Sequence, residues 1–319
     1  MKIGITGGAG FIGSNLTRSL VLDGYETLVL DDFSTGLLSN LKDLNCEIIR
    51  GSLTDSSVVS EFIDNVDFVF HLAARGSVPR SISDPQQTFD TNVVGTQILL
   101  EEIRKKSVPV VFSSSSSVYG DNPQLPKVET IRLSPISPYA ASKASGEYMM
   151  SSYARSYGLS CRIFRFFNVY GPGQRPDHIY SAVIPKWIWA ALKGEEVKIF
   201  GDGEHVRDFT FISDVVNVLK NAISSRVHED EPINLALGNP VSLNQLIRIL
   251  QSWFPNLNSV HQPARLGDVK SSYNNPEKLL SFMPNIKTTE LKQGLDITIE
   301  WLRRELLGRE PEKGSETSS

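Results

Sequence analysis

Two side chains that could transfer a proton lie four residues apart in segment 137–143. Ser137 is a helix-capping residue type and Pro138 suits a first helical turn, so Tyr139 and Lys143 are predicted on one face of a helix. A phenol, with a pKa of about 10, is a poor base at neutral pH. We expect the ammonium group of Lys143 to lower the pKa of Tyr139 and make it a usable acid/base. Taken alone, this spacing is also typical of a solvated helical face.

A run of five serines, residues 113–117, follows the apolar stretch 108–112. Open α/β sheets bind ligands beyond the carboxyl ends of their strands. A hydroxyl group from this run is therefore expected to bond a substrate oxygen and share its proton with Tyr139. Serine runs are also common in flexible loops.

Three glycines follow the first apolar stretch and precede a helical pattern. Gly7 allows a tight turn, Gly10 lets the main chain approach a pyrophosphate, and Gly13 permits close packing of helix on strand. The N-terminus of that helix offers N–H groups to phosphates. Asp31 follows Gly13 by 18 residues, where a carboxylate accepts ribose hydroxyls and repels a 2′-phosphate. The spacing predicts an NAD site, against the alternative of a glycine turn and an acidic loop.

Short apolar stretches alternate with amphipathic ones in the first half of the chain. We expect strands at 1–6, 26–30, 46–50, 67–72, 108–113 and 160–166, and helices at 11–24, 56–65, 85–106 and 139–157. The strands are apolar at both parities, as in a parallel sheet covered on both faces. The predicted fold class is α/β, a doubly wound Rossmann parallel sheet with a smaller C-terminal substrate-binding lobe.

The predicted domains follow this pattern. Residues 1–170 form an NAD-binding Rossmann domain that also takes in parts of 205–235. Residues 171–308, where proline and glycine become frequent, form the substrate-binding lobe, and the polar tail 309–319 is expected to be disordered.

The composition excludes several classes of protein. The 319 residues carry a net charge of −4 without a long basic run, so we expect no nucleic-acid partner. Cys46 and Cys161 lie too far apart in the sequence to suggest a disulfide framework. No apolar run approaches the roughly 18 residues of a membrane span, and the first residues do not resemble a signal peptide, so no membrane partner and a cytoplasmic location are expected. The histidines have no ligand spacing, and no metal is expected.

Together these motifs resemble the extended short-chain dehydrogenase/reductase family, and within it the UDP-sugar 4-epimerases. The resemblance spans about residues 1–307 and rests on segments 6–13, 31–36, 71–74, 91–96, 115–120, 139–143 and 165–171. It implies that Tyr139 is the acid/base and that Lys143 supports it and holds the nicotinamide ribose. It also implies that Ser115 assists at the sugar O4, because the family places this hydroxyl four residues before the tyrosine of a Val-Tyr-Gly motif, here Tyr119.

The resemblance implies further cofactor positions, with NAD as the cofactor. Besides the three glycines, Asp31, Tyr139 and Lys143, they are Phe11, Ile12, Asp32, Ser34, Thr35, Gly36, Ser52, Leu53, Leu72, Ala73, Ala74, Asn92, Ser113 and Phe166. One departure is clear. Ser52 stands where the family often has an aspartate that contacts adenine, so a weaker contact is expected there.

The resemblance also implies which residues bind a UDP-sugar. Asn168, Arg207 and Arg265 match positions that contact the diphosphate, and a guanidinium can bond two phosphate oxygens at once. Asp268 matches a contact to the uridine ribose. The other expected substrate positions are Gly76, Ser77, Ser115, Ser116, Ser117, Val183, Ile199 and Ser272. In isolation, Arg207 beside Asp208 would be interpreted as a surface ion pair.

The implied reaction oxidises C4 of the sugar, giving a 4-keto sugar and bound NADH, and returns the hydride to the other face. Family dehydratases carry an acid/base pair just after the Ser/Thr position, whereas this chain has Ser116 and Ser117 there. The pattern favours epimerisation. A dehydratase or decarboxylase that takes its acid from elsewhere in the cleft remains an alternative. A non-catalytic dinucleotide sensor is a second alternative, against which Tyr139, Lys143 and Ser115 argue.

The sugar itself is predicted from three features. Segments 119–129 and 182–187 resemble UDP-N-acetylglucosamine 4-epimerases. Ser272 falls where the family has either a bulky tyrosine or a small residue, and a small residue leaves room for an acetamido group. We expect UDP-GlcNAc and UDP-GalNAc to be preferred, with UDP-Glc and UDP-Gal as further candidates. Arg75 and Arg80 leave UDP-glucuronate open, because either could meet a carboxylate. Family resemblance also implies a homodimer through helices 85–106 and 139–157.

Overall fold

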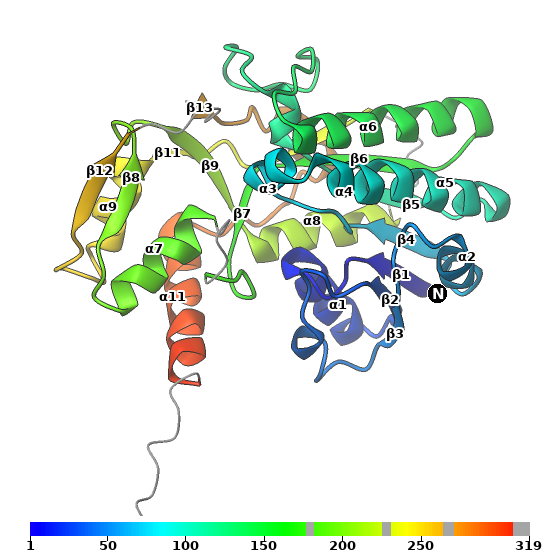
Figure 1. Ribbon diagram of the computed structural model, residues 1–319, viewed down its shortest axis with the longest axis horizontal. Helices are drawn as coiled ribbons and strands as arrows, with labels where there is room; N and C mark the ends of the chain where they lie inside the picture. The colour runs from blue at the N-terminus through cyan, green and yellow to red at the C-terminus, as the bar shows by residue number, and fades with distance from the viewer. Residues whose placement is uncertain (177–181, 225–230, 264–270, 309–319) are drawn as a thin grey trace, which may run out of the picture.

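A parallel sheet of seven strands forms the larger part of the structure (Figure 1). The computed structural model describes residues 1–176, 182–224, 231–263 and 271–308. The strand order is β10-β6-β5-β4-β1-β2-β3, and all the pairings are parallel. The strands are β1 (Lys2–Thr6), β2 (Glu26–Asp31), β3 (Glu47–Arg50), β4 (Phe68–His71), β5 (Val110–Ser115), β6 (Cys161–Phe166) and β10 (Ile233–Leu235). This doubly wound order confirms the predicted fold class.

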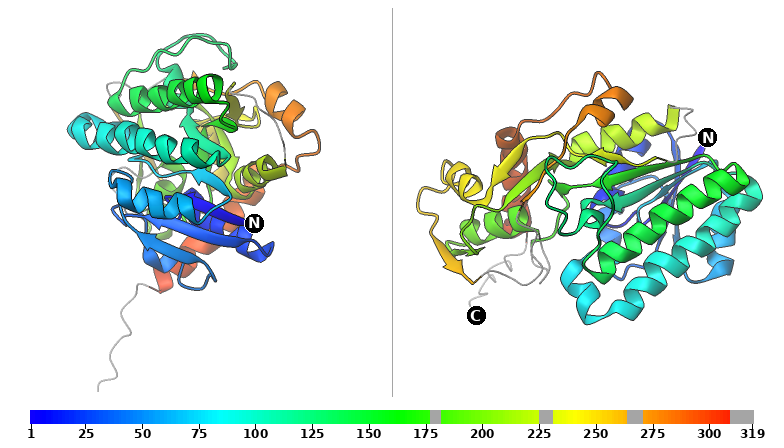
Figure 2. Two further views of the ribbon diagram at one scale, coloured as in Figure 1. Left: turned by 90° about the vertical axis from the view of Figure 1, so that its right-hand side faces the viewer. Right: turned by 90° about the horizontal axis from the view of Figure 1, so that it is seen from above.

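Helices cover both faces of this sheet (Figure 2). Helix α1 (Phe11–Leu22) packs with α8 (Ile212–Ser224) on one face, and α2 (Ser56–Asp64), α5 (Gly95–Lys106) and α6 (Pro138–Tyr157) lie together on the other. Successive strand residues such as Val69 and Phe70 are both fully buried. The double covering explains why the strands are apolar at both parities.

The long helix expected at 85–106 contains a π-helical segment. Helix α3 (Val78–Ser83) is followed by α4 (Pro85–Phe89), a π-helical segment η2 (Asp90–Val94) and α5. Asn92, in the π segment, is buried, and its side chain binds the main chain of Arg75 and the hydroxyl of Ser142. Such π segments often occur at functional sites, and this one turns a polar side chain inward. The predicted bounds 85–106 match the contiguous run of α4, η2 and α5, and the π segment inside it was not predicted.

In the residues that the structure describes, the smaller lobe contains two further sheets and three helices. Strands β7 (Asn168–Tyr170), β11 (Pro240–Ser242) and β13 (Ser271–Ser272) pair with β9 (Val206–Phe211), and β8 (Val197–Phe200) pairs with β12 (Ser259–Gln262). The helices are α7 (Val183–Leu192), α9 (Leu243–Leu250) and α11 (Leu291–Leu307), whereas α10 (Glu277–Phe282) packs against β10 and β6 of the large sheet. A continuous buried cluster that includes Phe164, Phe211 and Leu295 joins the lobe to the large sheet.

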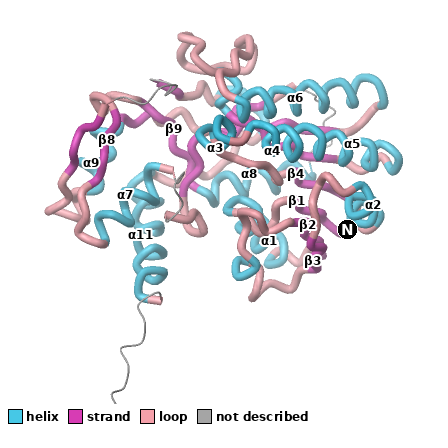
Figure 3. Tube along the Cα trace, viewed as in Figure 1, coloured by secondary structure: helices cyan, strands magenta, loops and turns pink. Residues whose placement is uncertain are grey.

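The described residues also include two 3₁₀ segments and a long loop. They are η1 (Leu38–Asn40) and η3 (Ser116–Tyr119), and the loop from η3 to α6 stands beside the start of that helix (Figure 3). Strand β5 extends two residues beyond its expected end, so the first three serines of the run belong to the strand and not to a loop. None of the described helices combines the length and apolarity needed to span a bilayer.

Candidate active site

A cavity of about 1150 Å³ lies at the carboxyl ends of the large sheet's strands. Residues after β1, β2, β4, β5 and β6 line one side, and residues of α7, β8 and β9 line the other. Pockets for small ligands and cofactors usually enclose about 300–1,000 Å³. The cavity is therefore large enough for a dinucleotide together with a second ligand, and it lies where open α/β sheets bind ligands.

Close backbone packing at one end of the cavity requires glycine. A Cβ atom on Gly13 would lie 2.1 Å from the carbonyl oxygen of Gly7, and one on Gly7 would lie 2.7 Å from the main-chain nitrogen of Ala73. Gly7 also has φ of +72°, which favours glycine. Helix α1 begins after Gly10 without a side-chain cap, which leaves its first N–H groups for a ligand. This corner fits the pyrophosphate of a dinucleotide.

Asp31 closes the same end of the cavity from β2. Its two carboxylate oxygens accept hydrogen bonds from the main-chain nitrogens of Ala9 at 2.9 Å and Phe33 at 2.8 Å. Burial raises the pKa of Asp31, and these two hydrogen bonds oppose the rise. The carboxylate thus shapes the glycine turn as well as facing the cavity, beside Asp32, Ser34 and Thr35.

The other expected cofactor positions divide into two groups. Phe11, Ile12, Leu53, Leu72, Ala73, Ala74, Ser113 and Phe166 line the cavity. Three others do not line it: Gly36, Ser52 and Asn92. Gly36 packs on Ala9, and the hydroxyl of Ser52 is hydrogen-bonded to that of Thr54. Asn92 lies behind the wall and accepts a hydrogen bond from the main chain of Arg75 at 2.8 Å. The structure thus gives Asn92 a supporting place.

The expected acid/base pair is brought together with the serine strand. Ser137 caps α6 through a hydrogen bond from Ala140 N at 3.2 Å, as the capping pattern predicted. Tyr139, Lys143 and Ser115 all line the cavity, and the Ser115 hydroxyl is hydrogen-bonded to Tyr139. Lys143 Nζ donates to the main-chain oxygen of Ser113 at 2.6 Å. The three groups can therefore bind and share protons at one point of the cavity.

The electrostatics of this pair differ from the sequence expectation. Burial raises the pKa of Tyr139, and the hydrogen bond from Ser115 only opposes the rise. Burial lowers the pKa of Lys143 to about 7, opposed by the charge of Glu147. The expectation that Lys143 would lower the pKa of Tyr139 is therefore corrected: desolvation raises this pKa, and the group that opposes the rise is Ser115 and not Lys143. A cationic ring next to Tyr139 would act against this desolvation.

The expected substrate positions also divide. Gly76, Ser77, Ser115, Asn168, Val183 and Arg207 line the cavity, whereas Ser116, Ser117, Ile199 and Ser272 do not. Arg265 and Asp268 lie outside the described residues.

Two of the positions that miss the cavity have clear physical explanations. Ile199 is buried in the core, while its neighbours Lys198 and Phe200 line the cavity, so the prediction was off by one strand position. Ser117 bonds the hydroxyl of Ser115 at 2.9 Å, so it orients a lining residue from behind.

Asp208 is not half of a surface ion pair with Arg207. It is fully buried and accepts hydrogen bonds from the main-chain nitrogens of Gly238 at 2.9 Å and Asn274 at 3.1 Å. Burial raises its pKa, and the backbone hydrogen bonds oppose this. Asp208 therefore anchors β9 and leaves its neighbour Arg207 at the cavity wall.

The sequence interpretation missed several residues that line the lobe side of the cavity, among them Lys186, Trp189, Gln174 and His205. A signal existed for part of this wall. Val183, Lys186 and Ala190 recur at helical spacing on α7, and all three line the cavity. No group of His, Cys, Asp or Glu residues that could hold a metal occurs in the described part of the chain.

Comparisons with known proteins agree with this geometry. The model of the NAD dependent epimerase/dehydratase family matches residues 3–237. A UDP-glucose 4-epimerase of Mycolicibacterium smegmatis is 35% identical, over 95% of this chain and 99% of its own. The structure of Thermotoga maritima UDP-glucose 4-epimerase with UDP-glucose is 36% identical, with a TM-score of 0.91 over 96% of this chain and 100% of its own.

A third relative carries a different sugar nucleotide. The UDP-N-acetylglucosamine 4-epimerase of Methanobrevibacter ruminantium, in complex with UDP-N-acetylmuramic acid, is 35% identical, with a TM-score of 0.90 over 95% of this chain and 98% of its own. Decarboxylases and a dehydratase are also among the relatives. The glycine corner, the serine strand and the Tyr139–Lys143 helix thus occur in a chain that belongs to the NAD dependent epimerase/dehydratase family, with NAD as its cofactor and UDP-sugar epimerases among its relatives.

Proposed function

We propose that this protein is an NAD-dependent UDP-hexose 4-epimerase that works through a 4-keto sugar. The observation that carries the proposal is the position of Tyr139, hydrogen-bonded to Ser115 at the cavity wall, one helical turn from Lys143. The described lining residues after β4, β5 and β6 include no Asp or Glu. Glu195 and Glu196, which follow α7, line the lobe side of the cavity. The absence of a carboxylate among the described lining residues after β4, β5 and β6 favours reversible oxidation at C4 over elimination.

The chain's own residues would act as follows. The phenolate oxygen of Tyr139 takes the proton of the sugar's O4 hydroxyl as C4 becomes a carbonyl, and returns it when C4 is reduced from its other face. Ser115 bonds O4 and the Tyr139 oxygen and holds them within reach of each other. Lys143, fixed by the Ser113 carbonyl, stabilises the phenolate. NAD, when bound, supplies the acceptor and donor of the C4 hydride and a positive ring beside Tyr139.

Cationic side chains support a nucleoside diphosphate as the group that anchors the substrate. Arg207 on β9 and Lys186 on α7 line the lobe side of the cavity, and Asn168 at the start of β7 also lines it. Guanidinium and ammonium groups stabilise a diphosphate through charge-assisted hydrogen bonds. Anchoring at this end leaves the sugar free to turn over beside Tyr139, which inversion at C4 requires.

We further propose a preference for UDP-N-acetylhexosamines. Ser272 on β13 pairs in register with Arg207, which places a small residue beside the cavity wall although Ser272 does not line it. The similarity to a UDP-N-acetylglucosamine 4-epimerase supports the same choice. Replacing Ser272→Tyr is expected to reduce turnover of UDP-GlcNAc more than that of UDP-glucose, with Ser281→Tyr on the exposed side of α10 as the control.

A UDP-glucuronate 4-epimerase is the second candidate. Arg75 lines the cavity, and its Nε is buried without a hydrogen-bond partner among the described residues. Its terminal nitrogen lies 3.8 Å from Asp84. A buried donor without a partner costs free energy, which a substrate carboxylate would relieve.

One experiment tests these choices. The protein is incubated separately with UDP-glucose, UDP-N-acetylglucosamine and UDP-glucuronate, with and without added NAD, and the anomeric protons are followed by NMR. We expect a galacto product from UDP-N-acetylglucosamine, with unchanged mass. A product lighter by water or carbon dioxide would instead identify a dehydratase or decarboxylase. NAD binding without conversion of any UDP-sugar would identify a dinucleotide sensor.

A homodimer through α5 and α6 is also proposed. Val94, at the end of η2, and Tyr148, on α6, are exposed apolar side chains in this region. Tyr148→Glu is expected to convert a dimer to a monomer in light scattering after gel filtration. A monomeric parent protein would contradict this part of the proposal.

A further inference from the structure

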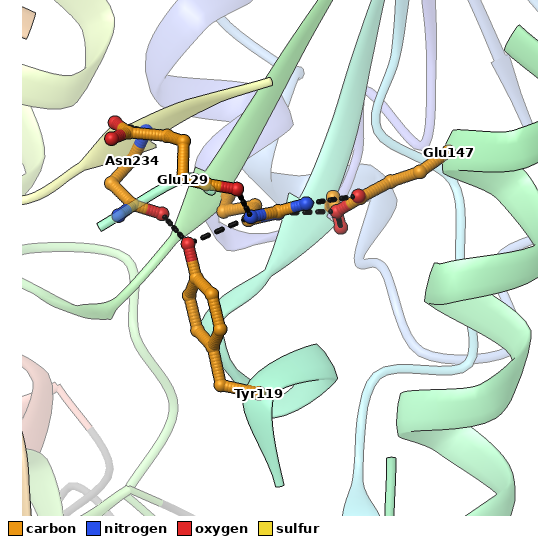
Figure 4. A network of polar contacts seen from close by, with 6 residues as sticks. Tyr119, Glu129, Glu147 and Asn234 are labelled. Atoms are coloured by element: carbon orange, nitrogen blue, oxygen red, sulfur yellow. Dashed lines mark hydrogen bonds and ion pairs between the residues drawn. The ribbon is translucent and has the colours of Figure 1, made fainter. Parts of the chain in front are cut away.

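A buried ion pair joins α6, the helix that carries Tyr139 and Lys143, to strand β6 (Figure 4). Glu147, one turn beyond Lys143 on α6, accepts hydrogen bonds from Arg165 on β6. The distances are 2.9 Å from Nε to Oε1 and 2.7 Å from Nη2 to Oε2. The side chain of Glu147 is only 5% exposed and that of Arg165 only 4%. Two parallel bonds of this kind fix the relative geometry of both groups.

The same face of α6 is tied to strand β5 along three successive turns. Residues 139, 143 and 147 recur every four positions, which places them on one helical face. Each is bound by a different serine of β5: Tyr139 by the Ser115 hydroxyl, Lys143 by the Ser113 carbonyl, and Glu147 by the Ser114 hydroxyl. The position of Glu147 is therefore coupled to the register of the whole acid/base face.

Arg165 is held independently of α6. Its Nη1 donates to the hydroxyl of Tyr119 at 2.7 Å and to the main-chain oxygen of Glu129 at 3.2 Å. Tyr119 in turn donates to Asn234 on β10 at 2.7 Å (Figure 4). The guanidinium is thus fixed by β6, η3 and β10, and it presents a rigid fork to the carboxylate of Glu147.

Glu147 is also the charged partner of Lys143. Burial lowers the pKa of Lys143 to about 7, and the charge of Glu147 opposes that fall. From β4, His71 adds no charge at neutral pH, because burial lowers its pKa to about 3.

The other charged groups on elements that pack against α6 bind elsewhere or face the cavity. Glu101 on α5 bonds Tyr153 farther along the helix, and Asp90 on η2 bonds Gln86. Arg80 on α3 lines the cavity.

We propose that Glu147 is a positioning residue for the acid/base pair. Clamped by Arg165 and bonded by the Ser114 hydroxyl, its carboxylate presents a fixed negative charge one turn from Lys143 and holds the Tyr139 face of α6 against β5. The role in turnover rests on the proposed epimerase function, whereas the effect on Lys143 does not.

The direct test is a titration of Lys143 in the full-length protein. Lysines are labelled with ¹³C at Cε, and the Lys143 signal is assigned by its loss in Lys143→Met. In Glu147→Gln we expect the pKa of Lys143 to fall by about half to one unit. The matched control, Glu101→Gln, removes a carboxylate that also contacts α6 and leaves this pKa unchanged. An unchanged pKa in Glu147→Gln overturns the proposal.

A second variant separates positioning from folding. Glu147→Gln leaves Arg165 buried without its partner, which destabilises a protein, whereas removing both charges often does not. In Glu147→Gln/Arg165→Met we expect the melting temperature to approach the parental value while the pKa of Lys143 stays lowered. Recovery of the parental pKa in this variant would reduce Glu147 to a purely structural role and overturn the proposal.

The kinetic test uses pH. For both variants the ratio of kcat at pH 8.5 to kcat at pH 6.5 is expected to fall about two- to threefold relative to the parent, because Lys143 loses its proton at a lower pH. An unchanged ratio, with an active parent protein, contradicts the role in turnover. If the parent converts no UDP-sugar, the proposed function fails, and the titration still decides the effect of Glu147.

Discussion

Lys143 Nζ donates to the main-chain oxygen of Ser113 at 2.6 Å, two residues before the serine whose hydroxyl meets Tyr139. The ammonium group and the acid/base pair are therefore anchored to the same strand, β5. A rotation of α6 would disturb both contacts together.

Tyr139→Phe removes the oxygen that would receive the O4 proton. We expect kcat to fall by about 10²- to 10⁴-fold, the usual contribution of a positioned acid/base. NMR of the anomeric protons measures the rate, and NADH fluorescence measures cofactor binding, which should change little. Tyr153→Phe, on the same helix but bonded to Glu101, is the control and should retain parental turnover. Parental turnover in Tyr139→Phe would rule out the acid/base assignment.

Lys143→Met should stabilise the protein at neutral pH. The pKa of Lys143 is about 7 when folded, against an ordinary value of 10.5, because burial disfavours the ammonium form. Between these values the unfolded chain binds more protons, so this group makes the parent more stable as the pH rises. We expect Lys143→Met to gain about 1–3 kcal/mol at pH 7 and less at pH 9.

Urea unfolding at the two pH values measures this difference. Lys105→Met, which removes an exposed lysine from α5, is the control and should show no comparable gain. A gain for Lys143→Met that does not shrink with rising pH would show that the stabilisation has another origin.

Gly13→Ala introduces a Cβ atom 2.1 Å from the carbonyl oxygen of Gly7. The turn must shift, so the free energy of unfolding should fall by about 2–4 kcal/mol and NAD affinity should fall with it. Gly308→Ala, whose new Cβ would meet its nearest atom at 3.4 Å, is the control. Denaturant unfolding and NADH fluorescence give the two readouts. Normal NAD affinity in Gly13→Ala would remove the pyrophosphate from this corner.

Arg207→Ala should weaken binding of the nucleotide end of the substrate. A hydrogen bond to a charged group contributes about 1.5–3 kcal/mol, so the Kd for UDP is expected to rise about 10- to 150-fold. Calorimetry with UDP measures this directly. Arg248→Ala, an exposed position on α9, should leave the Kd unchanged. A parental Kd for UDP in Arg207→Ala would place the diphosphate elsewhere.

The sequence predicted the large sheet well because its signals are local. Each expected strand, glycine turn and helix start is defined by residues close in the sequence. The cap of α6 by Ser137, three residues before Ala140, is an example. Strand β10 is different. It has three residues, and only its pairing with β6 makes it a strand.

The site was predictable to the same extent. Tyr139 and Lys143 share one helix, so their spacing shows their relation, whereas Glu147 and Arg165 meet from elements that no spacing connects. The pKa of Tyr139 was predicted wrongly for a related reason. The neighbouring lysine is visible in the sequence, but the desolvation that raises the pKa of Tyr139 depends on the packed structure.

Strand β10 and helix α8 also limit how this protein can be re-engineered. The chain leaves the large sheet after β6, builds β7, α7, β8 and β9, and then returns through α8 and β10 before building β11. A gene cut near residue 171 would remove α8 from α1 and leave the edge of β6 unpaired, a template for aggregation. Grafting a new sugar specificity from a relative would therefore require two separate inserts, one on each side of a retained 212–235 segment.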